Sequence, residues 1–171
     1  MTDSYIAIDY HKNCAELYKS GETISGVYTI DPDGSGSFDV FRDQTTAGGG
    51  WTVFQKRIDG SVDFYRDWAE YKSGFGNLYG EFWLGLDKIY RLTNKERYQL
   101  RVDLEDTEGK TAYAEYDMFA ITSEKTKYKL SVGTYSGSLL ARLLVRNFIE
   151  FFLIISLIFM IRSDPYDFLR Y

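Results

Sequence analysis

Acidic and hydroxyl side chains between residues 31 and 39 have the spacing of a calcium-binding loop. The first, third, fifth, sixth and ninth positions of an EF-hand loop are matched by Asp31, Asp33, Ser35, Gly36 and Asp39. The twelfth position requires a bidentate glutamate, whereas this chain has Arg42, a fixed cation, at that place. Pro32 and the lack of flanking amphipathic helices also argue against calcium. We therefore predict a polar turn between two strands and no metal site.

No other group of side chains has the spacing of a catalytic site, and we predict that the chain is not an enzyme. The single histidine, His11, lies in a polar stretch with no serine, cysteine or carboxylate arranged around it. Asp103, Glu105 and Asp106 are close in sequence, but strand alternation places Asp103 and Glu105 on the solvent face. The glycines at 48–50 lack the lysine and the helix of a phosphate-binding loop.

The glycine triplet instead introduces a strand. Gly48, Gly49 and Gly50 directly precede a β-prone run that starts at Trp51. Glycine allows a positive φ or the close approach of another part of the chain. We therefore interpret the three glycines as a device of backbone geometry.

Two short helices are expected to follow. Asp67 is predicted to be the N-cap of the first helix, with Glu70 as its capping-box partner and Gly74 as the residue that ends it. The second helix is predicted over 81–92, where apolar residues recur with helical spacing. We expect this helix to cover one face of a sheet.

Three strands are predicted after the second helix. Apolar and polar residues alternate over 98–106, as in a half-buried antiparallel strand. The run 111–121, rich in Tyr and Phe, is its predicted hairpin partner, and a third strand is predicted through Tyr128, Leu130 and Val132. The sequence therefore predicts an α+β fold, mainly an antiparallel sheet with two short helices packed on it.

Composition is typical of one ordered globular domain. The chain has 171 residues, of which 44% are hydrophobic, and its 15 Tyr, 12 Phe and 3 Trp supply apolar area for a core. The formal charge is −5, and the basic residues are scattered rather than gathered in a stripe that could contact phosphates. We therefore expect no nucleic-acid partner.

Several segments, in order, resemble the fibrinogen C-terminal domain, a fibrinogen-related family with ficolin-like, tenascin-like and angiopoietin-like members. The clearest are GGGWTVFQKRIDGSVDFYRDW, YQLRVDLED and YKLSVGTYSG. The resemblance covers 13–137, and we predict a domain with these bounds, followed by a divergent hydrophobic tail over 138–171. It also implies a small N-terminal subdomain before Trp51.

The resemblance implies a secreted, non-catalytic, extracellular recognition module of the kind found in the extracellular matrix and in innate immunity. The partners it implies are glycans, in a lectin-like carbohydrate-binding mode, acetylated groups or cell-surface receptors. It leaves open whether the chain forms an oligomer or contacts a membrane. In the family the calcium site and the ligand pocket follow the YKLSVGTYSG segment, where this sequence departs from the pattern. We therefore expect a truncated fragment with an incomplete family fold, no ligand pocket and no cofactor.

The resemblance also raises a question about the only cysteine, Cys14. Cys14 matches the first cysteine of a disulfide that closes the N-terminal subdomain in the family. The partner position falls in the run 38–43, where this chain has Arg42, so we expect Cys14 to be unpaired. Loss of such a link removes about 3 kcal/mol of loop-closure stabilisation. In an oxidising compartment an odd cysteine favours intermolecular pairing.

The conformation of the tail is open from the sequence alone. In the family the last stretch of chain adds a strand within the central sheet, so a chain that departs early is expected to leave strand edges unpaired. Residues 148–161 have the β-branched and aromatic content of a replacement strand, but they are equally compatible with a helix.

Two further interpretations concern the origin of the tail. A tail-anchored protein could use residues 143–161, although this run is shorter than the roughly 20 apolar residues of a bilayer span and contains Glu150. We favour the second interpretation, in which a read-through or a shifted frame produced the tail. The N-terminal residues MTDSYIAIDYHKNC have no signal-peptide pattern, so the expectation of secretion rests on the resemblance alone.

Overall fold

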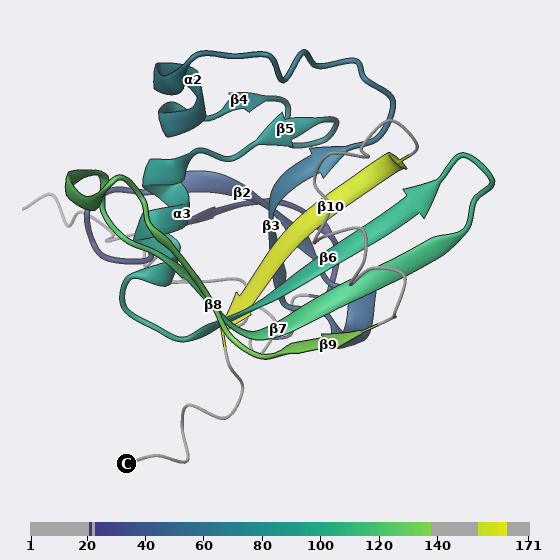
Figure 1. Ribbon diagram of the computed structural model, residues 1–171. Coiled ribbons are helices and arrows are strands. Elements are labelled where there is room, and N and C mark those ends of the chain that lie inside the picture. Colours follow the sequence, from purple (N-terminus) through teal and green to yellow (C-terminus); the bar gives the residue numbers. More distant parts are fainter. Residues whose placement is uncertain (1–20, 22, 138–153, 164–171) are drawn as a thin grey trace, which may run out of the picture.

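The computed structural model describes residues 21, 23–137 and 154–163. In this part of the chain ten strands form one sheet (Figure 1). The strands are β1 (Gly26–Ile30), β2 (Phe38–Asp43), β3 (Trp51–Arg57), β4 (Phe75–Gly76), β5 (Phe82–Trp83), β6 (Tyr98–Asp106), β7 (Thr111–Ile121), β8 (Leu130–Val132), β9 (Tyr135–Gly137) and β10 (Ile154–Ser163). The helical elements are η1 (Thr46–Gly48), α2 (Trp68–Ser73), α3 (Leu86–Thr93) and η2 (Glu124–Thr126), of which η1 and η2 are 3-10 turns.

The sheet has the strand order β1-β2-β3-β10-β6-β7-β8. β5 pairs with both β3 and β4, β9 pairs with β7, and all of these pairings are antiparallel. The predicted α+β class is therefore confirmed, with a mainly antiparallel sheet and two short helices.

β10 lies in the middle of the sheet (Figure 1). It pairs with β3 on one side and with β6 on the other, and Ile161 is opposite both Thr52 and Leu100. Met160 and Ile161 are only 1% and 0% exposed. Of the two conformations considered for the tail, residues 154–161 adopt the strand. The expected unpaired edges of β3 and β6 do not occur, because β10 pairs with both.

The position of β10 bears on the tail-anchor interpretation, which places residues 143–161 in a bilayer. Residues 154–161 would have to leave the centre of the sheet to reach a membrane. Within the described ranges, no helix is both long enough and apolar enough to cross one.

The β6–β7 hairpin has one apolar and one charged face, as its alternation predicts. On the apolar face Leu100 and Val102 are 5% and 0% exposed. On the other face Arg101 Nη2 lies 2.8 Å from Asp103 Oδ1, and Arg101 Nη1 lies 2.6 Å from Glu115 Oε1. The face with Leu100 and Val102 is therefore buried, whereas the face with Arg101 carries ion pairs.

α2 begins and ends as its sequence predicts. The backbone N–H of Glu70 donates to Asp67 Oδ1 at 2.9 Å, and the backbone N–H of Asp67 donates to Glu70 Oε2 at 3.3 Å. These two bonds form the predicted capping box, and Gly74 follows the last helical residue.

The prediction of a second helix over 81–92 is wrong at its start. The helix begins at Leu86, and Phe82–Trp83 form β5 instead. Gly85 separates the two elements with a φ of 109°, and a Cβ at this position would lie 2.6 Å from the Ser73 carbonyl carbon. α3 packs against β7 and buries Ile89, so it covers one face of the sheet as expected.

The third strand of the predicted meander is shorter than expected. β8 starts at Leu130, because Tyr128 has a φ of 49° and is buried in the preceding turn. Leu130 and Val132, whose alternation is typical of a buried face, are 56% and 44% exposed. The sheet therefore leaves apolar side chains of β8 uncovered.

The buried carboxylate of Glu81 holds the connection between β3 and α2. Its side chain is 1% exposed and accepts hydrogen bonds from the backbone N–H groups of Ile58, Asp59, Gly60 and Val62 at 2.6 to 2.9 Å. Burial alone would raise the pKa of this carboxyl, but the four donors outweigh burial and lower the pKa from 4.5 to about 2. A single anion therefore organises this loop.

We predict that Glu81→Gln lowers the free energy of unfolding by about 3 kcal/mol at pH 7, the equivalent of a pKa lowered from 4.5 to about 2. Because the folded-state pKa is lowered, this stabilisation is present above about pH 4.5 and is lost as the pH falls toward 2. Urea unfolding of both proteins at pH 7, 4 and 3 measures the difference, which should shrink with acidification. Glu105→Gln, on the exposed side of β6, is the control, and an equal effect there would contradict the assignment.

Candidate binding surfaces

Arg91 of α3 lies at the centre of the loop whose spacing resembles a calcium site. Its Nε is 3.1 Å from both carboxylate oxygens of Asp33, and its Nη2 is 3.3 Å from Asp31 Oδ1 and 2.6 Å from the carbonyl oxygen of Gly36. The hydrogen bond from Arg91 lowers the pKa of Asp33, against the opposing effect of burial. The two aspartates thus bind a cation that the chain itself supplies.

The carboxylates of the β6–β7 hairpin also have structural partners. Asp103 binds Arg101, and Asp106 Oδ1 accepts from the backbone N–H groups of Glu108 and Lys110 at 2.9 Å, which shapes the turn. Across the residues that the structure describes, no group of three or more His, Cys, Asp or Glu side chains could hold a metal ion.

Arg42, the residue at the expected partner position of Cys14, is fully buried in β2. Its guanidinium carbon lies 5.1 Å from the ring centre of Tyr28, a cation–π distance. Cys14 and His11 lie outside the described residues. The unpaired state of Cys14 therefore stays a prediction.

The glycine triplet forms a tight corner between η1 and β3. Gly49 has a φ of 75°, and a Cβ at this position would lie 2.5 Å from the carbonyl oxygen of Gln44. The backbone N–H of Gly50 donates to Gln44 Oε1 at 2.7 Å, and Trp51 Nε1 donates to the carbonyl oxygen of Thr46 at 2.9 Å. The chain folds back on itself so closely that position 49 has no room for a side chain.

The same corner holds β10 through Arg162. Its Nη1 donates to the carbonyl oxygens of Ala47 and Gly49 at 3.2 and 3.1 Å. Its guanidinium carbon lies 4.3 Å from the ring centre of Trp51. The glycine corner therefore also binds the Arg162 side chain of the central strand β10. The sequence pattern did not indicate this role.

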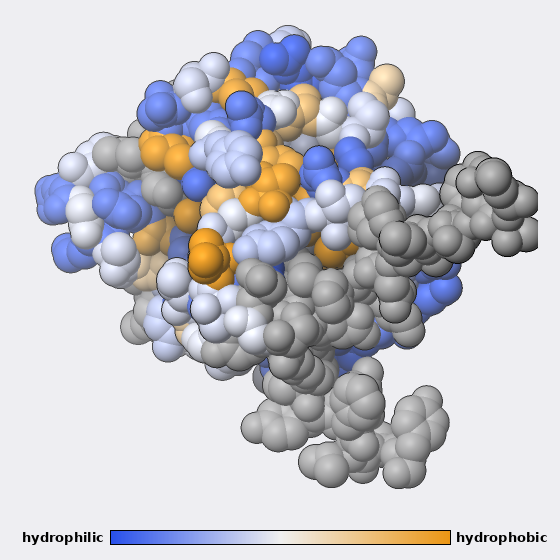
Figure 2. Space-filling view, turned by 180° about the vertical axis from the view of Figure 1, so that it is seen from behind, coloured by the Kyte–Doolittle hydropathy of each residue, from blue (hydrophilic) through white to orange (hydrophobic). Residues whose placement is uncertain are grey.

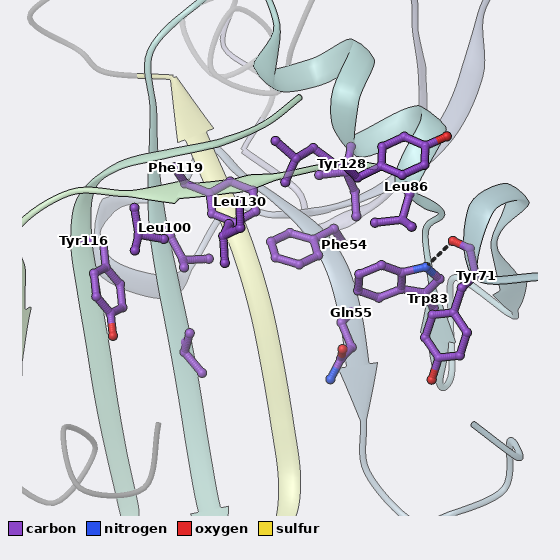
Figure 3. Close-up of a pocket in the computed structure, with 14 residues that line it drawn as sticks. Phe54, Gln55, Tyr71, Trp83, Leu86, Leu100, Tyr116, Phe119, Tyr128 and Leu130 are labelled. Carbon is purple, nitrogen blue, oxygen red and sulfur yellow. Dashed lines mark hydrogen bonds between the residues drawn. The ribbon is translucent and has the colours of Figure 1, made fainter. Parts of the chain in front are cut away.

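An open apolar groove of about 610 Å³ lies between α3 and the sheet (Figure 3). Its lining comes from β3, α2, β5, α3, β6, β7, β8 and the turn before β8, and it includes no charged side chain. The lining residues are Phe54, Gln55, Tyr71, Trp83, Leu86, Ile89, Leu100, Val102, Tyr116, Phe119, Ile121, Tyr128, Leu130 and Val132.

Aromatic rings form much of the groove wall (Figure 3). The rings of Phe54 and Phe119 are stacked with their centres 5.4 Å apart, and Trp83 meets Phe54 edge-on at 6.0 Å. The indole N–H of Trp83 donates to the carbonyl oxygen of Tyr71 at 2.7 Å, so its polar atom is satisfied away from the groove. The groove therefore presents ring faces rather than hydrogen-bonding groups.

The three phenols of the groove are neutral at physiological pH. Burial raises the pKa of Tyr71, Tyr116 and Tyr128, and a hydrogen bond to Asp87 raises that of Tyr128 further. A surface without charge and with few polar atoms suits an apolar peptide face better than an ionic ligand or acid–base chemistry.

Three aromatic side chains at or near α2 are largely exposed. Tyr65, Trp68 and Tyr79 are 96%, 56% and 71% exposed. They lie just before α2, at its start and between β4 and β5, elements that share one end of the molecule in Figure 1. We call these three residues the α2-end aromatic surface. Tyr and Trp are enriched at protein interfaces.

Hydrophobic side chains also gather in a patch on the face of the molecule shown in Figure 2, bordered by hydrophilic ones. Such patches are typical of contact surfaces rather than of catalytic sites.

Residues 10–152 match the family described as fibrinogen beta and gamma chains, C-terminal globular domain. The chain belongs to this fibrinogen C-terminal family. The match extends 15 residues beyond residue 137, the predicted end of the domain (152 − 137). The fold and the family expected from the resemblance are therefore confirmed.

Fibrinogen-family relatives share about half of their residues with this chain over the matched region. Angiopoietin-related protein 7 of mouse is 50% identical over 129 residues, which is 74% of this chain and 38% of the relative. Human fibroleukin is 50% identical over 75% of this chain and 29% of its own length. Chicken tenascin-R is 49% identical over 74% of this chain and 10% of its own length. The chain thus spans well under half the length of these relatives.

Solved fibrinogen-like structures have the same fold. The fibrinogen-like globe domain of human ANGPTL2 superimposes with a TM-score of 0.81 at 29% identity, covering 91% of this chain and all of that domain. The lamprey fibrin D-dimer, complexed with the peptide ligand Gly-His-Arg-Pro-amide, gives a TM-score of 0.71 at 42% identity over 78% of this chain and 43% of its own.

We predict that Gly49→Ala lowers the free energy of unfolding by about 3 kcal/mol or more, because backbone strain adds to the clash with Gln44. Gly109→Ala is the matched control: its φ is 77°, but nothing lies within 4 Å of the added Cβ. The control should lose only about 1 kcal/mol, the cost of the backbone conformation. Thermal and urea unfolding measure both variants, and equal losses would show that the close approach at Gly49 contributes nothing.

Proposed function

We propose that this fibrinogen-family chain is a non-catalytic extracellular recognition module that binds a protein on a cell surface. The observation that carries the proposal is the α2-end aromatic surface, where Tyr65, Trp68 and Tyr79 are largely exposed. Exposed aromatic side chains bury large apolar areas on contact and are enriched among the residues that dominate binding energy.

The state of the charged side chains supports a non-catalytic role. Asp33 is bound by Arg91, Glu81 by four backbone N–H groups, and Asp103 by Arg101. Each of these carboxylates already accepts hydrogen bonds from groups of the chain itself, so it is a poor nucleophile. The extracellular location is supported by the family assignment.

Glycans and acetylated groups remain within the range that the family resemblance implies. A protein partner is favoured here because the candidate surfaces offer aromatic and aliphatic area. Sugar recognition usually relies on several convergent polar groups, and the groove supplies few. We propose that binding needs neither calcium nor another cofactor.

We predict that the fluorescently labelled protein binds intact cells, that trypsin treatment of the cells removes binding, and that EDTA leaves it unchanged. Combining Tyr65→Ser, Trp68→Ser and Tyr79→Ser should weaken binding at least tenfold, because the aromatic contact area is lost. Tyr113→Ser, which removes a 41% exposed tyrosine from the β6–β7 hairpin, is the control and should bind as the unaltered chain does.

Two results would contradict the proposal. Calcium-dependent capture on an acetylated-sugar resin would instead assign a lectin activity. Unchanged cell binding by the folded triple variant would remove the α2-end aromatic surface from recognition.

A further inference from the structure

β8 lies at one edge of the sheet. In the part of the chain that the structure describes, β8 pairs with β7 on one side and with no strand on the other. Its three residues are all exposed. Leu130 and Val132 are among the residues that line the apolar groove (Figure 3). The groove therefore reaches the edge of the sheet.

The edge exposes backbone groups as well as side chains. Lys129 and Gly133 flank β8 and form backbone hydrogen bonds across the β7–β8 ladder at 3.0 and 2.8 Å. Hydrogen-bonded and non-hydrogen-bonded positions alternate along an antiparallel ladder, so Leu130 and Val132 direct their N–H and C=O groups away from β7. A further strand can pair with β8 through these groups.

The groove determines which side chains such a strand needs. In an antiparallel pair, residues directly opposite each other project to the same face of the sheet. The added residues opposite Leu130 and Val132 therefore extend the uncharged groove wall, where apolar side chains fit. The residue between them, opposite Ser131, projects to the other face.

Basic side chains are concentrated at one end of β8. Three exposed lysines precede the strand, namely Lys125, Lys127 and Lys129. The carboxylate of Glu124 beside them already binds Lys72, with 2.7 Å between Oε2 and Nζ. The stretch 130–137, by contrast, contains no charged residue. This end of the edge is therefore complementary to an acidic group.

We propose that the β8 edge binds an extended peptide of a partner protein as an added antiparallel strand, with alternate apolar side chains over the groove and acidic residues at its C-terminal end. Antiparallel addition continues the pairing of the whole described sheet and places the C-terminal end of the peptide beside Lys129. Main-chain hydrogen bonds give such complexes affinity, and alternate side chains give them specificity. The inference goes beyond the proposed function, because it concerns a surface other than the α2-end aromatic surface.

The lysines favour a separate acidic peptide over a second copy of the chain. Two copies of β8 that pair antiparallel around Ser131 place Lys129 of each copy opposite Gly133 of the other, which carries no charge. A peptide with the order apolar, polar, apolar, acidic instead places its acidic residue opposite Lys129. Opposite charges across a ladder stabilise the pair.

A peptide selection on the folded full chain tests the proposal without knowledge of the partner. Random ten-residue peptides displayed on phage are the probe. Enriched sequences should have two apolar residues two positions apart, followed by Asp or Glu. No enrichment, or apolar residues at the intervals of three and four that a helix requires, would overturn strand addition.

Backbone methylation of the tightest selected peptide tests the main-chain pairing and leaves the protein unaltered. A single N-methyl group should weaken binding at least tenfold at two positions, two residues apart, because these N–H groups donate to β8. At the position between them the N–H points away from β8, so methylation there should change binding less than twofold. Equal losses at all three positions would contradict the pairing.

A charge reversal tests the orientation of the peptide. Lys129→Glu should weaken binding of the selected peptide at least fivefold, because it places like charges opposite each other. Lys110→Glu makes the same charge change at an exposed lysine of the β6–β7 turn and should bind as the unaltered chain does. Equal losses in the two variants would exclude a specific role of the lysines before β8.

A second pair of variants tests the groove side of the edge. Leu130→Ser should weaken peptide binding at least fivefold, because it removes an apolar contact. Ile24→Ser removes an aliphatic side chain that is 72% exposed near the opposite edge strand, β1, and should leave binding unchanged. If Leu130→Ser also left binding unchanged, the groove would have no part in it.

The two proposals fail or hold separately. The combined Tyr65→Ser, Trp68→Ser and Tyr79→Ser variant should bind the selected peptide as the unaltered chain does, whatever its effect on cell binding. A loss of peptide binding in this variant would overturn the assignment to the β8 edge. Self-association of the chain that the selected peptide abolishes would assign the edge to a second copy instead.

Discussion

The pairing of β10 with both β3 and β6 is the interaction on which the rest of the structure depends. Without it, β1-β2-β3 and β6-β7-β8 would be separate ribbons, each with an unpaired edge. The groove also depends on it, because Phe54 of β3 and Leu100 of β6 line one hollow only when β10 spaces their strands. Arg162 adds a direct contact between β10 and the glycine corner.

Charged residues in this domain mostly organise backbone. Arg91 of α3 donates a hydrogen bond to the β1–β2 turn. Glu81 accepts hydrogen bonds from backbone N–H groups of the loop before α2, and Asp106 accepts them within the β6–β7 turn. Each of them satisfies polar groups of a loop, which would otherwise remain exposed to water or unbonded. The acidic clusters that the sequence pattern singled out are in this way part of the architecture.

Local features could be predicted from the sequence because the residues that decide them are close together in the chain. The capping box of α2 spans four residues, and the alternation of β6 is visible within nine. The partners of Arg91, Glu81 and Arg162 could not be predicted, since each lies at least 19 residues away. The groove was missed for a related reason: apolar alternation in β8 indicates a buried face but not whether a neighbour covers it.

The place of β10 also has a consequence for biosynthesis. The residues on either side of the β3–β10 ladder, such as Thr52 and Ile161, are more than a hundred positions apart (161 − 52). During translation β3 and β6 therefore emerge long before the strand that joins them. Contacts of such long sequence separation form slowly, and open strand edges are prone to pair with other chains. Until β10 has emerged, the edges of β3 and β6 that it covers in the folded domain are open to pairing with other chains.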